Sequence, residues 1–403
     1  MNEGLYKMST NEKHKMLINQ NINTIKSVEP VYSGDDYFLR LQRIINEAKN
    51  EIHLQTYIFE NDAAGKAIAA CLKEAALRQV KVYVLLDGYG SKALPEKFTN
   101  DLVQHGIHFR FFSPFFSTNS FFIGRRLHHK VVVADGSIAL IGGINIADKY
   151  HGTKTEEPWL DYAVQADGEI AGPLQELCRN IYFKKKQQAR IKTISFFYSG
   201  GGASIRILQN DWVKRKNEIS SAYNSAVQNA KKEVINFGSY FLPGRRLTTT
   251  LKNAAGKGVK IKLVLSGISD MPLIRRATCY LYSLLIRHNM ELYEWNKSVL
   301  HGKVAVADDE WVTIGSHNLN HLSSYGSIEM NVEIHSPQFS AIFKPHLNKV
   351  IAQCEKITIE TIEIRNGIIS KFINWLSYRL VRTGLIIITY LPYKRFFKRY
   401  HAE

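Results

Sequence analysis

Residues 128–145 read HHKVVVADGSIALIGGIN, and residues 301–318 read HGKVAVADDEWVTIGSHN. Both stretches follow one pattern, His-x-Lys-x4-Asp-x6-Gly-(Gly/Ser)-x-Asn. The first copy begins at His128 and the second at His301, so each half of the chain carries one copy. A motif that recurs at this distance predicts two similar structural units in the chain.

Each motif contains a short run rich in β-branched residues, which is typical of a strand. Alternate side chains of a strand share a face, so the histidine and the lysine of each motif are expected to point the same way. These pairs are His128 with Lys130 and His301 with Lys303. A turn and a second strand follow, and the Gly-Gly or Gly-Ser pair at the end of that strand lets backbone pass close to a ligand. Polar groups that could contact such a ligand come next, at Asn145 and Asn318.

A histidine beside a lysine suits phosphoryl chemistry. Imidazole can act as nucleophile, general acid or general base at neutral pH. Lysine is a cation that neutralises phosphate oxygens, whereas a metal centre requires converging His, Asp, Glu or Cys side chains. The sequence therefore predicts a metal-independent site without a cofactor. Ordinary strand residues would be a credible alternative for one motif, but two copies with the same offsets argue against it.

The repeat extends beyond the motifs. Residues 48–59 parallel residues 230–241, and helix-like segments flank each stretch. Strands that alternate with helices at this spacing predict an α/β fold with mixed, largely parallel sheets flanked by helices. Polar and glycine-rich residues between the copies indicate a boundary. The predicted parts are an N-terminal arm at 1–27, a first domain at 28–183, a linker at 184–203, a second domain at 204–364 and a C-terminal tail at 365–403.

Composition indicates the partner and the compartment. The chain has 403 residues and a formal net charge of +17, so its partner is expected to be anionic, either nucleic acid or an acidic membrane surface. Four scattered cysteines argue against a disulfide framework or a zinc site and for a reducing compartment. We expect no signal peptide. The most apolar uncharged run, at 384–391, is far shorter than the ~20 residues that span a bilayer.

The tail favours the membrane over nucleic acid. Residues 365–403 contain eight basic side chains, and their only acid is Glu403. On helical spacing the tail carries one apolar stripe, made of Ile369, Phe372, Ile373, Leu376 and Leu380. Cationic and aromatic residues around such a stripe are typical of an interfacial anchor. We expect the tail to dock on an anionic membrane; the alternative is a helix packed on the protein's own core.

The paired His-x-Lys-x4-Asp motifs resemble those of the phospholipase D superfamily. Within it, the chain is similar to the bacterial cardiolipin synthases of the type without N-terminal transmembrane helices, over about residues 30–380. The supporting stretches lie at 84–91, 125–130, 161–164 and 318–323. The resemblance implies two tandem phospholipase D-like α/β domains that pack about a pseudo-twofold axis and bring both histidines to one site.

The resemblance also implies a mechanism. His128 attacks the phosphorus of phosphatidylglycerol, and His301 protonates the leaving glycerol and then deprotonates the acceptor hydroxyl. Transfer to a second phosphatidylglycerol would give cardiolipin, and transfer to water would give phosphatidic acid.

Further matching residues are expected to support this chemistry. Phosphate oxygens would be held by two lysines and two asparagines, namely Lys130, Lys303, Asn145 and Asn318. Asp161 and Glu329 resemble carboxylates that orient a histidine through its second ring nitrogen, although their positions alone would also suit surface carboxylates. The motif aspartates, Asp135 and Asp308, are expected to brace the motif loops.

Three functions remain open on these grounds. The first is a phosphatidyltransferase on the cytoplasmic side of the cell membrane, peripherally bound, with phosphatidylglycerol as substrate and no nucleic-acid partner. The second is a phosphodiesterase of the same superfamily that hydrolyses phospholipid or nucleic acid. The third, a non-catalytic binding module, is disfavoured because all six motif residues are present. The acceptor lipid and the oligomeric state stay open.

Overall fold

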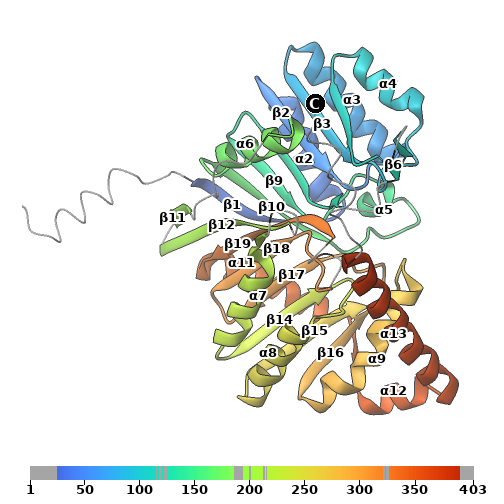
Figure 1. The fold of residues 1–403 in the computed structure, drawn as a ribbon. Coiled ribbons are helices and arrows are strands. Elements are labelled where there is room, and N and C mark those ends of the chain that lie inside the picture. Colours follow the sequence, from blue (N-terminus) through green and yellow to red (C-terminus); the bar gives the residue numbers. More distant parts are fainter. Residues whose placement is uncertain are drawn as a thin grey trace, which may run out of the picture.

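The computed structural model of the chain describes residues 25–114, 116–117, 120–121, 125–185, 194–198, 201–211, 214, 216–320, 323 and 326–390. Most of the predicted N-terminal arm, part of the predicted linker and the end of the tail lie outside these residues. The described residues form two halves, each built on a large sheet with helices against it (Figure 1).

The first half extends from β1 to α6. Its sheet strands are β1 (Ile25–Tyr32), β2 (Glu51–Thr56), β3 (Lys81–Asp87), β4 (His108–Phe112), β8 (Lys130–Ala134), β9 (Ile138–Gly142) and β10 (Tyr162–Gly168). Its helices are α2 (Asp35–Glu47), α3 (Ala63–Leu77), α4 (Glu96–Gln104), α5 (Asp148–His151) and α6 (Ala171–Tyr182). The short strands β5 (Phe116–Ser117) and β6 (Ser120–Phe121) pair with each other.

The second half extends from β11 to α13. Its strands are β11 (Ile194–Tyr198), β12 (Gly201–Asp211), β13 (Lys216–Asn217), β14 (Glu233–Gly238), β15 (Lys260–Ser266), β16 (Met290–Trp295), β17 (Lys303–Ala307), β18 (Trp311–Gly315), β19 (Ser327–His335) and β20 (Glu355–Ile357). Its helices are α7 (Glu218–Asn229), α8 (Arg245–Gly256), α9 (Pro272–Arg287), α11 (Pro337–Ile351), α12 (Ile359–Arg365) and α13 (Ile368–Tyr390).

The two sheets share one strand order. The first runs β1-β10-β9-β8-β2-β3-β4, and the second contains β12-β19-β18-β17-β14-β15-β16 in corresponding positions. The α/β class and the two mixed sheets with flanking helices are thereby confirmed. The sequence repeat therefore extends to the topology of each half.

The expectation that the sheets are largely parallel was wrong. Parallel pairing joins β2 to β3 to β4 and β14 to β15 to β16, and the other neighbours along both sheets are antiparallel. The reason lies in the motifs. Tight turns at Asp135 and Asp308, both with positive φ, join β8 to β9 and β17 to β18 as hairpins, and a hairpin forces antiparallel pairing.

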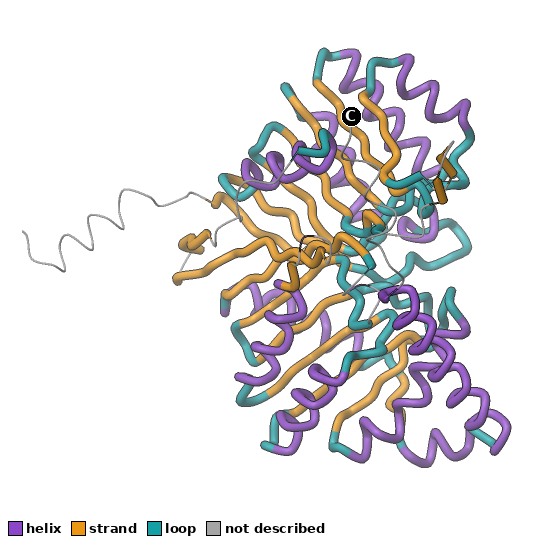
Figure 2. The backbone as a smooth tube through the Cα atoms, viewed as in Figure 1, coloured by secondary structure: helices purple, strands orange, loops and turns teal. Residues whose placement is uncertain are grey.

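Three large apolar clusters hold these layers, and a fourth, small one contains Leu85, Leu127 and Ile328. One lies in the first half, where α2 and α3 cover the sheet, and a second lies where α7, α8 and α9 cover the other sheet. The third takes residues from both sheets and from α6 and α11, so it joins the halves. Tyr162 of β10, for example, makes edge contacts with the rings of Phe237 and Phe343 across the junction. Figure 2 shows the strands gathered in the middle of the molecule and helices at both ends.

Two backbone contacts cross between the halves and position the site. β7 (Arg126–Leu127) leaves the first half and pairs in parallel with β19, where Leu127 lies opposite Ile328. Leu160 forms a parallel bridge with Leu300. In the first crossing, His128 follows Leu127 and Glu329 follows Ile328. In the second, Asp161 follows Leu160 and His301 follows Leu300. Each crossing therefore sets a motif histidine beside a carboxylate of the other half.

Candidate active site

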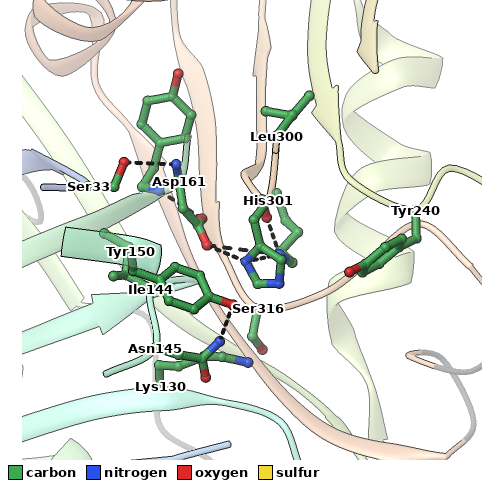
Figure 3. Close-up of polar contacts among 12 residues, drawn as sticks. Ser33, Lys130, Ile144, Asn145, Tyr150, Asp161, Tyr240, Leu300, His301 and Ser316 are labelled. Atoms are coloured by element: carbon green, nitrogen blue, oxygen red, sulfur yellow. Dashed lines mark hydrogen bonds and ion pairs between the residues drawn. The ribbon is translucent and has the colours of Figure 1, made fainter. Parts of the chain in front are cut away.

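The second motif histidine is held by the first half. His301 follows the Leu160–Leu300 bridge, and its backbone N–H donates to the Leu160 carbonyl at 2.9 Å. Its ring Nδ1 lies 2.6 Å from Asp161 Oδ2, as Figure 3 shows. Asp161 is fully buried at the start of β10, and its other oxygen accepts the N–H of Tyr162 at 2.8 Å.

The first motif histidine is held by the second half in the same way. The backbone N–H of His128 donates to the Ile328 carbonyl at 3.0 Å, and its Nδ1 lies 2.9 Å from Glu329 Oε2. Glu329 is fully buried in β19, and the hydroxyl of Ser316 donates to the same oxygen at 2.5 Å. Each carboxylate accepts from the Nδ1–H of its histidine, which leaves the Nε2 lone pair for a ligand, and Lys303 Nζ also lies 2.8 Å from His301 Nδ1.

The motif lysines lie on the same sheet face as their histidines. Lys130 Nζ donates to the His128 carbonyl at 2.5 Å, and Lys303 Nζ contacts the His301 carbonyl. The lysines are 2% and 1% exposed respectively, so both ammonium groups are almost fully withdrawn from water. Residue 129 points the other way, since the buried His129 ring bonds Gln55 at 2.9 Å. The alternation expected for a strand is therefore present around the first motif.

Burial lowers the pKa values of both lysines. Burial, opposed by the charge of Glu329 and reinforced by that of Lys303, lowers the pKa of Lys130 to about 7. Burial lowers the pKa of Lys303 to about 8, against the charge of Asp161. Because each half's lysine affects groups of the other half, the two motifs form one electrostatic site.

The pKa values of the histidines and of Asp161 are lowered as well, so the imidazoles are kept neutral and the carboxylate is kept charged. Burial, reinforced by the charge of Lys303 and opposed by that of Asp161, lowers the pKa of His301 to about 3. The pKa of His128 is also lowered by burial, with Glu329 opposing. Burial raises the pKa of Asp161, but the charges of Lys303 and His301 outweigh it and hold that pKa below its ordinary value. Below about pH 7 and without ligand, the site therefore holds neutral imidazoles between charged carboxylates and charged lysines.

The two motif asparagines have different surroundings. Asn145 accepts from the Ile58 N–H at 3.0 Å and the Thr56 hydroxyl at 3.3 Å, and its amide donates to Tyr150 at 2.8 Å. Asn318 is 5% exposed, and its Oδ1 has no hydrogen-bond partner. The motif spacing does not distinguish these two environments.

The motif aspartates lie at the far ends of the motif strands from the histidines. Asp135 accepts three backbone N–H groups at the start of β2, at 2.8 to 2.9 Å. Asp308 accepts three in the same way at the start of β14, at 2.8 to 3.1 Å for its shortest contacts. These contacts fasten the turn after each motif strand to the neighbouring strand.

The sequence reasoning missed a second pair of supporting residues. Asp87, fully buried at the end of β3, accepts the N–H of Leu127 at 2.8 Å, directly before His128. Ser266, at the end of β15, accepts the N–H of Leu300 at 3.2 Å, directly before His301. Their positions in the sequence could have suggested this role, because Asp87 and Ser266 both end the second parallel strand of their repeat.

The sequence reasoning also missed the aromatic walls. Tyr150 and Trp159 lie 5.2 and 5.8 Å from the His301 ring, and Tyr240 lies at 6.3 Å. The ring of Tyr57 lies 4.9 Å from that of His128. His128 keeps 15% of its side chain exposed and His301 only 6%. The first histidine is therefore the more accessible of the two. No motif signals these rings, since Tyr150 lies in the short helix α5 and the other three lie in loops between elements.

Within the described parts of the chain, no group of three or more His, Cys, Asp or Glu side chains is arranged to hold a metal ion. The arrangement suits an anion, because two buried ammonium groups can neutralise it between two imidazoles with free Nε2 lone pairs. An anion there would offset the lysine charges and raise the pKa of His301, so that this ring could carry a proton once the ligand is bound.

The lysine pKa values predict how anion binding depends on pH. An anion needs both ammonium groups charged, so affinity should fall as pH rises through 7 to 8, by up to ~10-fold per pH unit for each lysine. Sulfate, whose charge is constant over this range, is the probe for calorimetry between pH 6 and 9.5. Lys130→Met should weaken binding and remove one of the two ionisations. A constant sulfate affinity up to pH 9 would contradict the low lysine pKa values.

Comparisons with known proteins identify the family of the chain. The family described as "Cardiolipin synthase, PLD-like domain" matches residues 41–175 and 223–351. The chain is 35% identical over 346 residues to cardiolipin synthase B of Shigella flexneri, covering 82% of each chain. It is 28% identical over 338 residues to a minor cardiolipin synthase of Bacillus subtilis, covering 83% of each. The phosphatidylserine synthase structure from Haemophilus influenzae has a TM-score of 0.70 at 13% identity, over 94% of this chain and 99% of that one, which shows a shared fold.

Proposed function

The chain belongs to the phospholipase D-like cardiolipin synthase family, and from this premise we propose that His128 carries the phosphatidyl group during transfer while His301 moves the protons. The enzyme is a phosphatidyltransferase of the cardiolipin synthase type, and its substrates are phospholipids. One observation supports the division of roles more than any other. The charges of both motif lysines act on both histidines, but His128 is the more exposed of the two rings.

In the first step, Nε2 of His128 attacks the phosphorus of phosphatidylglycerol. An N–P bond forms, the P–O bond to the headgroup glycerol breaks, and His301 gives its proton to the leaving glycerol oxygen. Glu329 stabilises the positive charge that develops on His128, since it accepts the Nδ1–H. Lys130 and Lys303 offset the negative charge on the phosphate oxygens.

In the second step, the hydroxyl of a second phosphatidylglycerol gives its proton to Nε2 of His301. Its oxygen bonds to phosphorus, the N–P bond breaks, and cardiolipin leaves with His128 neutral again. Asp161 keeps the His301 ring in the tautomer that can accept this proton. Water in place of the hydroxyl would give phosphatidic acid. Of the two motif asparagines, Asn318 has the free capacity for a ligand.

The test is a product assay. Purified enzyme is incubated in detergent with phosphatidylglycerol labelled in its headgroup glycerol and in its acyl chains, with and without phosphatidylethanolamine. Cardiolipin and free glycerol should appear in equal amounts. Phosphatidic acid alone would assign the enzyme to hydrolysis, and an unchanged lipid would overturn the proposal.

The location follows from helix α13. We infer that the enzyme binds peripherally to an anionic membrane, on the cytoplasmic side, through the outer face of this helix. In Figure 1, α13 runs alongside α9, and the two pack together. The side of α13 that packs inward carries Asn374 and Ser377, which are 6% and 4% exposed, together with Tyr378, which packs against the apolar core of the second half. The apolar stripe faces outward instead, with Phe372 58% and Leu380 57% exposed.

This orientation argues against a helix that buries its apolar side in the protein's own core. A soluble helix normally places its apolar side inward, so an inverted helix has a partner outside the protein. Exposed Leu273, Tyr280 and Leu284 of α9 extend the apolar surface. In the described part of the chain, no helix combines the length and apolarity needed to cross a bilayer. Arg365 is ion-paired with Glu294 and Glu355, so it adds no free charge to this surface.

Point substitutions test the membrane surface without removing the helix. Phe372→Gln with Leu380→Gln should weaken binding to phosphatidylglycerol vesicles by on the order of 30–1000-fold, from about 1–2 kcal/mol of lost apolar burial at each site. Vesicle sedimentation measures this, and high salt should weaken wild-type binding without abolishing it. Leu39→Gln, on α2 and 63% exposed, is the matched control. Equal vesicle binding by the double variant and the control would place the membrane surface elsewhere.

A further inference from the structure

A tyrosine–carboxylate pair lies at the edge of the site, beside His301. The ring of Tyr240, in the loop after β14, lies 6.3 Å from the His301 ring, on the side away from Asp161 (Figure 3). Its hydroxyl donates to both oxygens of Asp270, at 2.7 and 2.8 Å. Asp270 is exposed to solvent, and nothing in the motif pattern predicts it.

A carboxylate is unexpected at the edge of an anion site. Burial lowers the pKa of Lys303, and Asp270 is among the carboxylates whose charge opposes that shift, so Asp270 lies within electrostatic reach of the phosphate position. A phosphate placed against Asp270 would be repelled. The position of Asp270 beside His301 is explained if the Asp270 carboxylate contacts a part of the substrate other than the phosphate, namely a part that donates hydrogen bonds.

Asn318 offers an unused acceptor near the same loop. Its Oδ1 is buried without a partner, and such a group costs free energy unless a ligand or water satisfies it. The segment that follows Asn318 borders the Tyr240 loop, because the Leu242 N–H donates to the Leu319 carbonyl at 3.0 Å. A second unpaired acceptor therefore lies on a segment next to the Tyr240 loop.

The first half lacks this arrangement at the corresponding positions. Ile58 occupies the place in β2's loop that Tyr240 occupies after β14. The Asn145 amide is already engaged by Thr56, Ile58 and Tyr150. The Tyr240–Asp270 pair and the unpaired Asn318 oxygen thus have no counterpart at Ile58 and Asn145, although Glu329 Oε1 is also an unpaired buried acceptor, beside His128.

We propose that Tyr240, Asp270 and Asn318 form a subsite that recognises the hydroxyls of a glycerol headgroup and so selects a polyol as leaving group and acceptor. The inference rests on the proposed function and specifies its substrate. The Tyr240 hydroxyl already donates its hydrogen bond to Asp270. The Tyr240 oxygen, the Asp270 carboxylate and the Asn318 amide oxygen can therefore only accept hydrogen bonds from a ligand, and a polyol supplies the matching O–H donors. An ammonium headgroup would meet the positive charges of Lys303 and Lys130. The bound hydroxyls turn the reacting oxygen toward Nε2 of His301.

Partition of the phosphatidyl intermediate tests the subsite independently of its rate of formation. Wild-type enzyme in detergent receives labelled phosphatidylglycerol with glycerol, ethanol and ethanolamine as competing acceptors, and the products are quantified by chromatography. Tyr240→Phe and Asp270→Asn should each lower the glycerol-to-ethanol product ratio by about 10-fold, the loss of one charge-assisted hydrogen bond. Both variants should still turn over, since neither residue bonds phosphate in this scheme.

The matched control is Tyr293→Phe. Tyr293 donates to Glu291 at 2.6 Å in the same kind of pair, on β16. Its product ratio should equal that of the wild type. An unchanged ratio in both subsite variants would overturn the inference, and a selective change in the ethanolamine product would make the subsite one for ammonium groups. If wild-type enzyme transfers to no alcohol at all, the proposed function fails and this inference fails with it.

A binding measurement gives a second readout without turnover. By calorimetry, wild-type enzyme should bind glycerol 1-phosphate more tightly than methyl phosphate, because only the former has free hydroxyls. Tyr240→Phe should remove that difference and leave the affinity for methyl phosphate unchanged. Equal affinities of wild-type enzyme for both probes would contradict the subsite even if product ratios change.

Discussion

His128→Ala should lower phosphatidyl transfer by at least about 10⁴-fold, since the variant loses the atom that bonds phosphorus. His301→Ala should lose a similar factor, because glycerol leaves poorly without a proton. Neither change should unfold the protein, because the apolar cluster that joins the halves contains neither residue. Product chromatography measures transfer, and the thermal unfolding midpoint checks the fold. His108→Ala, an exposed histidine of the first half, is the control.

A substrate with an activated leaving group separates the two roles. A phosphatidyl ester of p-nitrophenol needs no proton for its leaving group, so His301→Ala should release one equivalent of p-nitrophenol in a burst. Mass spectrometry should then find the phosphatidyl group on His128. The same ester should give no burst with His128→Ala. A burst from His128→Ala, with the adduct on His301, would reverse the assignment, and near-normal transfer in either variant would refute a two-histidine mechanism.

Asp161→Asn is expected to have the second largest effect, a loss on the order of 10³–10⁴-fold in transfer. The Asn amide can donate to Nδ1, and His301 would then carry its proton on Nε2, where it cannot accept one from the acceptor hydroxyl. The carboxylate also raises the pKa of His301 against burial, so its loss should move the acidic limb of the pH–rate profile to lower pH. Glu329→Gln should likewise lower transfer, because the Gln amide can donate to Nδ1 of His128 and leave the proton on the Nε2 that must attack phosphorus.

The control for Asp161→Asn lies on the same strand. Asp167, near the end of β10, bonds Ser27 and Gln165 and does not contact a motif histidine. Asp167→Asn should leave both transfer and the pH profile unchanged. If Asp161→Asn behaves like Asp167→Asn, the 2.6 Å contact with His301 has no role in orienting the ring.

The sequence predicted the fold class, the repeat and the family from local signals. A motif of fixed spacing and a hydrophobic period of two are both visible over a few residues, so the strands at 130–134 and 303–307 could be predicted directly. Strand direction was less accessible. The turn residues after each motif indicated a hairpin, but the helices between β2, β3 and β4 suggested parallel pairing throughout.

The partners of the histidines could be suggested only by resemblance. Glu329 lies 201 residues after His128, and Asp161 lies 140 residues before His301. No local pattern reports such distances, because they depend on how the halves pack. The acceptors of Tyr240, Asp270 and Asn318 were invisible for a related reason. Their significance lies in which hydrogen bonds are left unmade, and only the folded structure shows that.

Each half supplies the carboxylate that orients the histidine of the other half, so neither site histidine is oriented unless the halves are packed together. His128 receives its orienting partner from β19, and His301 receives its partner from β10, so parting the halves disconnects both at once. A ribosome releases the first half well before Glu329 is made. During that interval a folded first half would expose a reactive imidazole to membrane lipid, yet it would lack the carboxylate that orients the ring. We therefore expect the nascent enzyme to be inactive until synthesis is nearly complete. Both histidines then receive their orienting carboxylates in a single assembly event.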